Sequence, residues 1–289
     1  MTLKSKLEAG NFAILAEIDP PKGVDVSMMI NNAMKVKGDV DAFIVPEMSS
    51  AVMRMSALGG AMILQSKGME TVMQVCCRDR NQLALQADIL AAYSCGIKNI
   101  MALTGDSPTI GDHSQAKGVY NITLLELIHT IKILQTGRDM AGIELTGKPE
   151  FLVGSTVNAG LKGNDLEVEL EEMNKKVEEG TKFFITPPLF SIESIESFLN
   201  VVDHRKTKII PTVLLLKSVG MARYMNRNMN HIHVPEDMIM RIQKAADKKA
   251  ECVLIANQII KNFKEEGFSG VNISTIGWED KLPEIIKGI

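Results

Sequence analysis

The sequence predicts a single (β/α)8 TIM barrel that spans residues 1–289. Eight short apolar runs, rich in β-branched residues, alternate along the chain with longer segments of helical period. This alternation is typical of a parallel sheet covered by helices. No linker or change of composition divides the chain, and eight repeats match a closed barrel of this class.

A doubly wound open sheet is the alternative arrangement of the same elements. However, no apolar run is followed by a G-x-G-x-x-G turn, and the chain contains no G-x-x-x-x-G-K-[ST] loop. Such glycine-rich turns bring backbone N–H groups to phosphate in Rossmann and P-loop proteins. The sequence therefore favours the barrel and predicts no nucleotide site of these two kinds.

The expected strands are short, apolar and bounded by polar or turn-forming residues, as buried parallel strands are. In chain order they cover residues 12–18, 41–46, 71–77, 99–105, 150–156, 182–187, 208–216 and 270–276.

Segments of helical period fill the intervals between these strands, most clearly at 26–37, 81–96, 122–135 and 165–180. In the last segment, apolar residues form one stripe, acidic residues come early and lysines come late, which indicates a surface helix. A glycine ends several helical segments just before the next strand. These glycines are Gly68, Gly96, Gly180 and Gly267.

The composition is that of a globular protein: 45% of the residues are hydrophobic and 23% are charged. The formal net charge is −3, from 32 basic and 35 acidic residues, which gives no footprint for nucleic acid or an anionic membrane. The first residues lack the apolar core of a signal peptide, and no apolar run approaches the ~20 residues of a membrane span. We therefore expect a cytoplasmic protein with neither a nucleic-acid nor a membrane partner.

The cysteines and histidines predict no metal site. Cys76, Cys77, Cys95 and Cys252 show no zinc-binding spacing, and we interpret them as small buried hydrophobic residues in a reducing compartment. His231 and His233 would share one side of a strand, but no third ligand follows nearby. We interpret this pair as surface or loop residues.

Polar residues collect at the expected carboxyl ends of the strands, where barrels of this class carry their active sites. Glu17 is the most informative of them because it interrupts the apolar run FAILAEI. A barrel interior tolerates a carboxyl group that is paired, hydrated or protonated. A catalytic acid with a raised pKa is therefore one interpretation of Glu17, and a structural role is the other.

Four motifs stand in order along the chain: Glu17-x-x-Pro20-Pro21, CRDRNQL (77–83), LTGDSP (103–108) and KKVEEGTKFFIT (175–186). With them, the chain resembles the methylenetetrahydrofolate reductase family over essentially its whole length. The length matches the catalytic barrel alone, so we expect no regulation by adenosylmethionine through the C-terminal domain of eukaryotic members. The resemblance implies a flavoprotein, with FAD or FMN, that reduces 5,10-methylenetetrahydrofolate to 5-methyltetrahydrofolate.

The resemblance implies catalytic roles for two carboxyl groups, both of which also contact the substrate. Glu17 matches the family's acid, which protonates N10 of the folate, and its apolar neighbours favour the protonated form. Asp106 matches an aspartate beside the pyrimidine edge of the flavin and the pterin. Pro187 and Ser218 are the other two positions expected to contact substrate.

The resemblance also implies which residues hold the flavin. Gly105 and Thr104 would offer backbone contacts to the ring, while Tyr120 and Asn121 would lie near the tail at a helix N-terminus, which suits phosphate. Glu169 and Lys176 would hold the ribityl and phosphate end, unless they form a solvated helix face. The whole expected set is Gln74, Thr104, Gly105, Asp106, Tyr120, Asn121, Ser155, Glu169 and Lys176.

Several positions depart from the family pattern. Thr104 stands where members often have arginine, and Gln74 stands where they have histidine. Pro187 replaces a glutamine that contacts folate and nicotinamide in turn, and Gly220 lies where a further contact is usual. These departures leave two candidates for the electron donor: NADH, or a partner subunit with an iron–sulfur or zinc centre. This chain has no cysteine spacing for a cluster, so any iron–sulfur cluster would belong to the partner. As in the family, we expect an oligomer.

Three other functions fit the same barrel and substrate. They are a folate-dependent methyltransferase, a catalytically silent folate-binding subunit, and a flavin-free reductase that uses nicotinamide directly. A flavin absorption spectrum would separate the expected reductase from all three.

Overall fold

Eight parallel strands close into a barrel in the order of the sequence, from β1 to β8. Closure comes from the pairing of the first and last strands, in which Ala13 lies beside Gly270 and Ala16 beside Ile273. The computed structural model describes residues 1–229 and 232–289. The predicted (β/α)8 barrel is confirmed, and the closed sheet excludes the doubly wound alternative.

Each strand coincides with one of the eight runs expected from the sequence. The strands are β1 (Ala13–Glu17), β2 (Ala42–Val45), β3 (Thr71–Cys76), β4 (Asn99–Leu103), β5 (Leu152–Thr156), β6 (Phe183–Pro188), β7 (Lys208–Leu214) and β8 (Gly270–Ser274). Seven of them are one or two residues shorter than the expected runs, because the first or last residues of those runs belong to the loops. Strand β6 instead continues to Pro188, with a register shift against β7 between Ile185 and Pro188.

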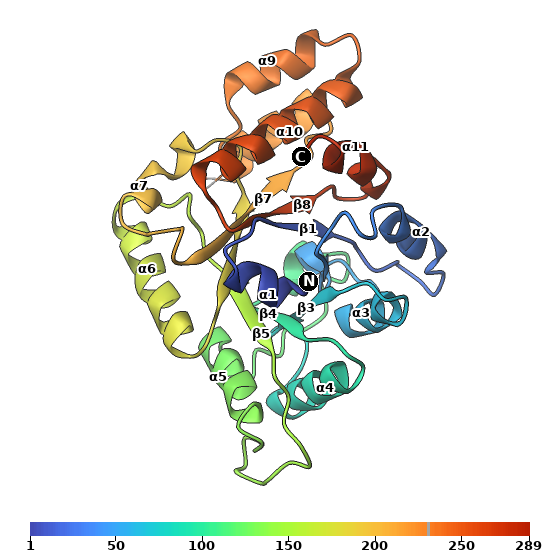
Figure 1. Cartoon of the computed structure of the whole chain (residues 1–289), viewed down its shortest axis with the longest axis vertical. Coiled ribbons are helices and arrows are strands. Elements are labelled where there is room, and N and C mark those ends of the chain that lie inside the picture. The colour runs from blue at the N-terminus through green and yellow to red at the C-terminus, as the bar shows by residue number, and fades with distance from the viewer. Residues whose placement is uncertain (230–231) are drawn as a thin grey trace.

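Helices surround the barrel as an outer ring, apart from α1, which lies across one end of the barrel (Figure 1). The α-helices are α1 (Leu3–Glu8), α2 (Ser27–Lys35), α3 (Ala57–Ser66), α4 (Gln82–Ser94), α5 (Leu124–Leu134), α6 (Gly163–Glu178), α7 (Glu196–Leu199), α8 (Val219–Asn228), α9 (Glu236–Lys244), α10 (Lys248–Glu266) and α11 (Leu282–Ile286). Short 3₁₀ turns lie at Ser49–Ala51, Pro108–Ile110, Glu193–Ile195 and Glu279–Lys281. His233 is exposed in the loop before α9, as expected, whereas His231 lies outside the described residues. Cys76, Cys77 and Cys252 are buried as expected, but Cys95, at the end of α4, is exposed.

The barrel interior is filled at the end where the strands begin. Leu15, Val72 and Phe183 point inward from the strands, and Leu3 and Leu7 of α1 pack against this group. The ring of Phe183 lies against Gly154 of β5, where a Cβ atom would collide with it. Burial of each such side chain stabilises the fold by roughly 1.5–3 kcal/mol. Helix α1 therefore closes the amino end of the barrel.

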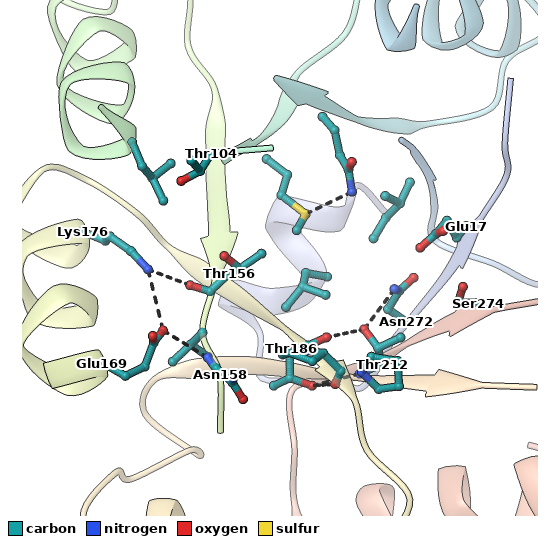
Figure 2. Close-up of a pocket in the computed structure, with 18 residues that line it drawn as sticks. Glu17, Thr104, Thr156, Asn158, Glu169, Lys176, Thr186, Thr212, Asn272 and Ser274 are labelled. Carbon is teal, nitrogen blue, oxygen red and sulfur yellow. Dashed lines mark hydrogen bonds and ion pairs between the residues drawn. The ribbon is translucent and has the colours of Figure 1, made fainter. Parts of the chain in front are cut away.

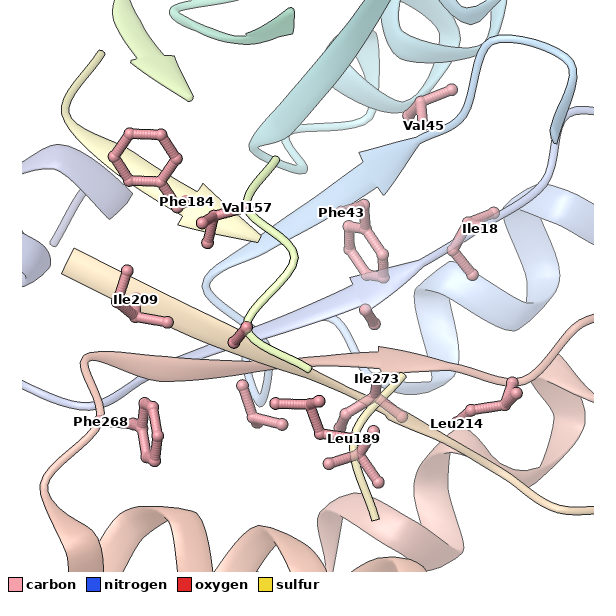
Figure 3. Close-up of a cluster of buried hydrophobic side chains, with 14 of the residues drawn as sticks. Ile18, Phe43, Val45, Val157, Phe184, Leu189, Ile209, Leu214, Phe268 and Ile273 are labelled. Carbon is pink, nitrogen blue, oxygen red and sulfur yellow. The ribbon is translucent and has the colours of Figure 1, made fainter. Parts of the chain in front are cut away.

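A second apolar layer lies between the sheet and the outer helices (Figure 3). Phe184 belongs to this layer, although its neighbour Phe183 belongs to the interior. The difference follows from the alternation of side chains along a strand. With the amino end filled and the outer face covered, the carboxyl ends of the strands are left to form a site.

Candidate active site

A cavity of about 480 Å³ opens at the carboxyl ends of the strands. Each of the eight strands contributes to its wall, so the cavity lies on the barrel axis (Figure 2). The lining residues are Glu17, Ile44, Gln74, Met101, Thr104, Leu124, Thr156, Val157, Asn158, Glu169, Lys176, Ile185, Thr186, Pro187, Pro188, Thr212, Asn272 and Ser274.

Glu17 is the last residue of β1 and places its carboxyl group in the cavity wall. Burial, with a smaller contribution from the negative charge of Asp19, raises the pKa of Glu17 from its ordinary value to about 7. Hydrogen bonding from Asn272 and Ser274 opposes this rise, while the charge of Glu279 adds to it. A carboxyl group with this pKa holds a proton in a large share of molecules near neutral pH, which is what a general acid requires.

A buried hydrogen-bond chain runs from the bulge of β6 towards Glu17. The Thr212 hydroxyl donates to the carbonyl oxygen of Thr186 at 2.7 Å. The hydroxyl has a single proton, so it accepts the hydrogen bond from Asn272 Nδ2 at 3.2 Å. The orientation of the Asn272 amide beside Glu17 is therefore set by Thr212 and, through it, by β6.

On the opposite side of the cavity, Lys176 extends from α6 (Figure 2). Its Nζ donates to the carbonyl oxygen of Thr156 at 3.0 Å and lies 3.8 Å from Glu169 Oε1. Glu169 Oε1 in turn accepts the backbone N–H of Asn158 at 3.1 Å. Burial lowers the pKa of Lys176, and the nearby Glu169 charge opposes the decrease. The loose ion pair leaves this ammonium group able to bind an anionic or hydroxyl-bearing ligand.

The side-chain amide of Gln74 supplies further donors to the wall. Its Oε1 accepts the backbone N–H of Glu47 at 3.2 Å, and its Nε2 lies 4.0 Å from the sulfur of Met101. A thioether is a weak acceptor, so the amide N–H groups remain available to a ligand. Thr104 lies in the same cavity wall, directly after β4.

The structure brings together six of the residues expected from the sequence, at the cavity wall: Glu17, Gln74, Thr104, Glu169, Lys176 and Pro187. Gly105, Asp106, Tyr120, Asn121, Ser155 and Ser218 lie outside the lining. Ser155 is buried in the barrel wall, where its hydroxyl donates to Ala102 O at 3.0 Å, and its neighbour Thr156 lines the cavity instead. Ser218 caps α8 by accepting the N–H of Met221 at 3.1 Å.

Tyr120 and Asn121 were expected to open the helix after β4, but α5 begins later, at Leu124, with Thr123 as its N-cap. Asn121 Oδ1 instead accepts the N–H of Gln82 at 3.0 Å, at the start of α4. The Tyr120 hydroxyl shares its single proton between the carbonyl oxygens of Gly105 and Asp106, at 3.3 and 3.2 Å. Both side chains therefore hold loops together.

Thr212 and Asn272 line the cavity but were not singled out by sequence reasoning. Both are polar residues within apolar runs, KIIPTVLLL and GVNISTI. The same signal pointed to Glu17. A search for polar residues within every apolar run would therefore also have identified Thr212 and Asn272.

Two negative findings concern the described residues alone. Within 1–229 and 232–289, no three His, Cys, Asp or Glu side chains are grouped to hold a metal ion. Across these same two ranges, none of the helices combines the length and apolar character that crossing a membrane requires.

Comparisons with solved structures show the barrel fold and no more, because the identities are low. The chain superposes on EDTA monooxygenase (EmoA) from Chelativorans sp. BNC1 with a TM-score of 0.56 and 9% identity, covering 96% of this chain and 92% of that one. It superposes on oxaloacetate acetylhydrolase with a TM-score of 0.55 and 10% identity, covering 94% and 78%.

Sequence comparison is more specific. A curated relative, methylenetetrahydrofolate reductase 2 of Schizosaccharomyces pombe, is 26% identical over 194 residues, which are 64% of this chain and 29% of the relative. The chain thus matches less than a third of that relative's length. The family profile described as methylenetetrahydrofolate reductase matches residues 2–289. The chain belongs to the methylenetetrahydrofolate reductase family.

Proposed function

We propose that this barrel reduces 5,10-methylenetetrahydrofolate to 5-methyltetrahydrofolate with a bound flavin. The observation that carries the proposal is Glu17, a carboxyl group with a pKa of about 7 in the wall of the central cavity. Its position at the end of β1, in the motif Glu17-x-x-Pro20-Pro21, matches the acid that the family resemblance implies. Residues 1–289 would then form one catalytic unit.

The donors of the cavity suit a flavin. Lys176 offers a buried ammonium group that is only loosely paired, which fits the ribityl hydroxyls or a phosphate. The amide of Gln74 and the Thr104 hydroxyl fit the carbonyl and nitrogen atoms of a polar ring. FAD is the cofactor we propose, and FMN would use the same contacts. When bound, a flavin supplies the hydride-transfer chemistry.

The role of Glu17 is to hold a proton and give it to N10 of the folate. An amine nitrogen accepts a proton most readily from an acid whose pKa is near the working pH. Protonation at N10 opens the five-membered ring of the substrate and leaves a reactive iminium carbon. Asn272 and Ser274 keep the Glu17 pKa from rising higher, so the carboxyl group releases its proton near neutrality.

The electron donor we propose is a partner protein, with NADH as the competing candidate. Pro187 lines the cavity, and a proline has neither a backbone N–H nor a side-chain donor. A nicotinamide carboxamide would therefore find no amide partner at this position. A partner with its own redox centre needs no such contact.

A single preparation tests the proposal. We expect the purified chain to be yellow, with a flavin spectrum, and to convert methylenetetrahydrofolate once the flavin has been reduced chemically. A protein that binds folate without any flavin would contradict the proposal. It would indicate one of the alternatives: a methyltransferase, a silent binding subunit or a flavin-free reductase.

A further inference from the structure

The motif CRDRNQL lies outside the cavity, yet it contains one of the most deeply buried charges of the chain. Arg78, two residues beyond the end of β3, is 2% exposed. Its Nε and Nη2 donate to the two carboxylate oxygens of Asp79, each at 2.9 Å. This bidentate pair fixes the plane of the guanidinium group.

The other N–H groups of Arg78 reach backbone carbonyls of two neighbouring loops. Nη2 donates to Glu47 O at 3.1 Å and Nη1 to Met48 O at 3.3 Å, both in the loop after β2. Nη1 also donates to Asp106 O at 3.4 Å, in the loop after β4. A guanidinium group has five N–H donors, and here five acceptors surround it.

The loop after β4 contacts Arg78 at both its beginning and its end. Gly105 has φ +86°, and a Cβ atom there would lie 3.0 Å from Arg78 Cβ, so the backbone rests directly on the arginine. Near the end of the loop, the backbone N–H of Val119 donates to the carbonyl oxygen of Arg78 at 2.6 Å. The Tyr120 hydroxyl then bridges back to Gly105 O and Asp106 O.

We propose that Arg78 is a positioning residue, with Tyr120 as its second anchor. Together they fix the backbone at Gly105 and Asp106 and so set where the exposed Asp106 carboxylate stands relative to the ligands of the cavity. The inference rests on the proposed function, because it assigns a placement to a carboxylate expected beside flavin and folate. Lysine cannot replace Arg78, since an ammonium group lacks the planar fork that reaches Asp79 and three carbonyls together.

A double-mutant cycle tests this inference. Asp106→Asn removes a negative charge near the flavin and is expected to make the reduced flavin easier to form and to raise the KM for folate. Arg78→Lys is expected to raise the same KM by up to about a hundredfold, the cost that a misplacement of about 1 Å can have. If Arg78 acts through Asp106, the double variant is little worse than Arg78→Lys alone, and Asp106→Asn no longer shifts the flavin midpoint potential in that background.

Arg80→Lys is the matched control. Arg80 belongs to the same motif, but it pairs with Glu47 Oε1 at 3.2 Å and with Asp88 Oδ2 at 2.8 Å, on side chains away from the loop after β4. It is expected to lower the unfolding temperature and to leave the effect of Asp106→Asn on KM and potential unchanged. Fully additive effects of Arg78→Lys and Asp106→Asn would overturn the inference.

If Arg78→Lys does not fold, Tyr120→Phe takes its place in the cycle. This variant loses only the hydroxyl that bonds Gly105 O and Asp106 O, and we expect the same non-additivity with Asp106→Asn at smaller magnitude. Additive effects in this cycle would also overturn the inference. A wild-type chain that binds neither flavin nor folate would instead overturn the proposed function, and the inference with it.

Discussion

Glu17 combines two environments that pull its pKa in opposite directions. Burial and the charge of Asp19 favour the protonated acid, whereas Asn272 and Ser274 favour the carboxylate. The result, a pKa of about 7, lies where a proton is both held and released near neutral pH. Asn272 and Ser274 of β8 therefore help to set the pKa at which Glu17 can act as an acid.

Glu17→Gln is expected to abolish most folate reduction while the flavin stays bound. General acids typically contribute about 10²–10⁴-fold, and glutamine keeps the shape of the side chain without an acidic proton. Rapid-mixing measurement of the two half-reactions checks this: flavin reduction should be unchanged and folate reduction slowed in that range. Glu265→Gln, on the exposed face of α10, serves as the control. Turnover of the Glu17 variant at the wild-type rate would show that the acid lies elsewhere.

The raised pKa of Glu17 also predicts a pH-dependent stability. The folded protein binds this proton more tightly than the unfolded chain, whose glutamate has a pKa of 4.5. Stability from this group is therefore full below pH 4.5 and is lost as the pH rises through about 7. By linkage, the loss is about 3 kcal/mol.

Glu17→Gln should remove this loss, because glutamine does not ionise. Denaturant unfolding at about pH 5 and about pH 8 measures the free energy of unfolding of both proteins, and the linkage relation predicts the difference between the two pH values. We expect the free energy of unfolding of the variant to increase relative to that of the wild type as the pH rises. A difference between the two proteins that is the same at both pH values would contradict a buried, titrating Glu17.

Helix α6 presents two adjacent lysines with opposite surroundings. Lys176 is buried at the cavity, whereas Lys175 is half-exposed and pairs with Glu172 at 2.7 Å on the outer face. Lys176→Met should weaken flavin binding by about 10–150-fold, the equivalent of one lost hydrogen bond to a charged group. Lys175→Met should leave the affinity unchanged. Flavin fluorescence titration measures both, and equal affinities in the two variants would place the anionic part of the ligand elsewhere.

The strands show what the sequence could predict and what it could not. All eight were found because burial on both faces leaves a local apolar run, visible without any tertiary information. The side chains facing the cavity were harder to identify, because successive residues of a strand point to opposite faces. An error of one residue therefore selects Ser155 in place of Thr156, which lines the cavity. Loop residues were hardest: Tyr120 bonds Gly105 and Asp106 through contacts that only the folded chain brings together.

At the scale of the whole molecule, the closed amino end leaves one face of the barrel open to the flavin, the folate and the electron donor that we propose. Helix α1 fills the entrance beneath the strands with Leu3 and Leu7, so access to the central cavity is from the carboxyl ends. A partner that delivers electrons must therefore dock on the βα loops. Pro187 lies at this end of the barrel, within β6 and at its register shift against β7.

The purified, flavin-loaded chain is therefore expected to be reduced slowly by NADH in the absence of oxygen. The reason is that Pro187, in the cavity wall, has no N–H group to donate to the oxygen of a carboxamide. Pro187→Gln restores an amide that both donates and accepts, and we expect it to accelerate flavin bleaching by NADH. Rapid bleaching of the wild-type flavin by NADH alone, at the speed of turnover, would show that this barrel needs no electron-transfer partner.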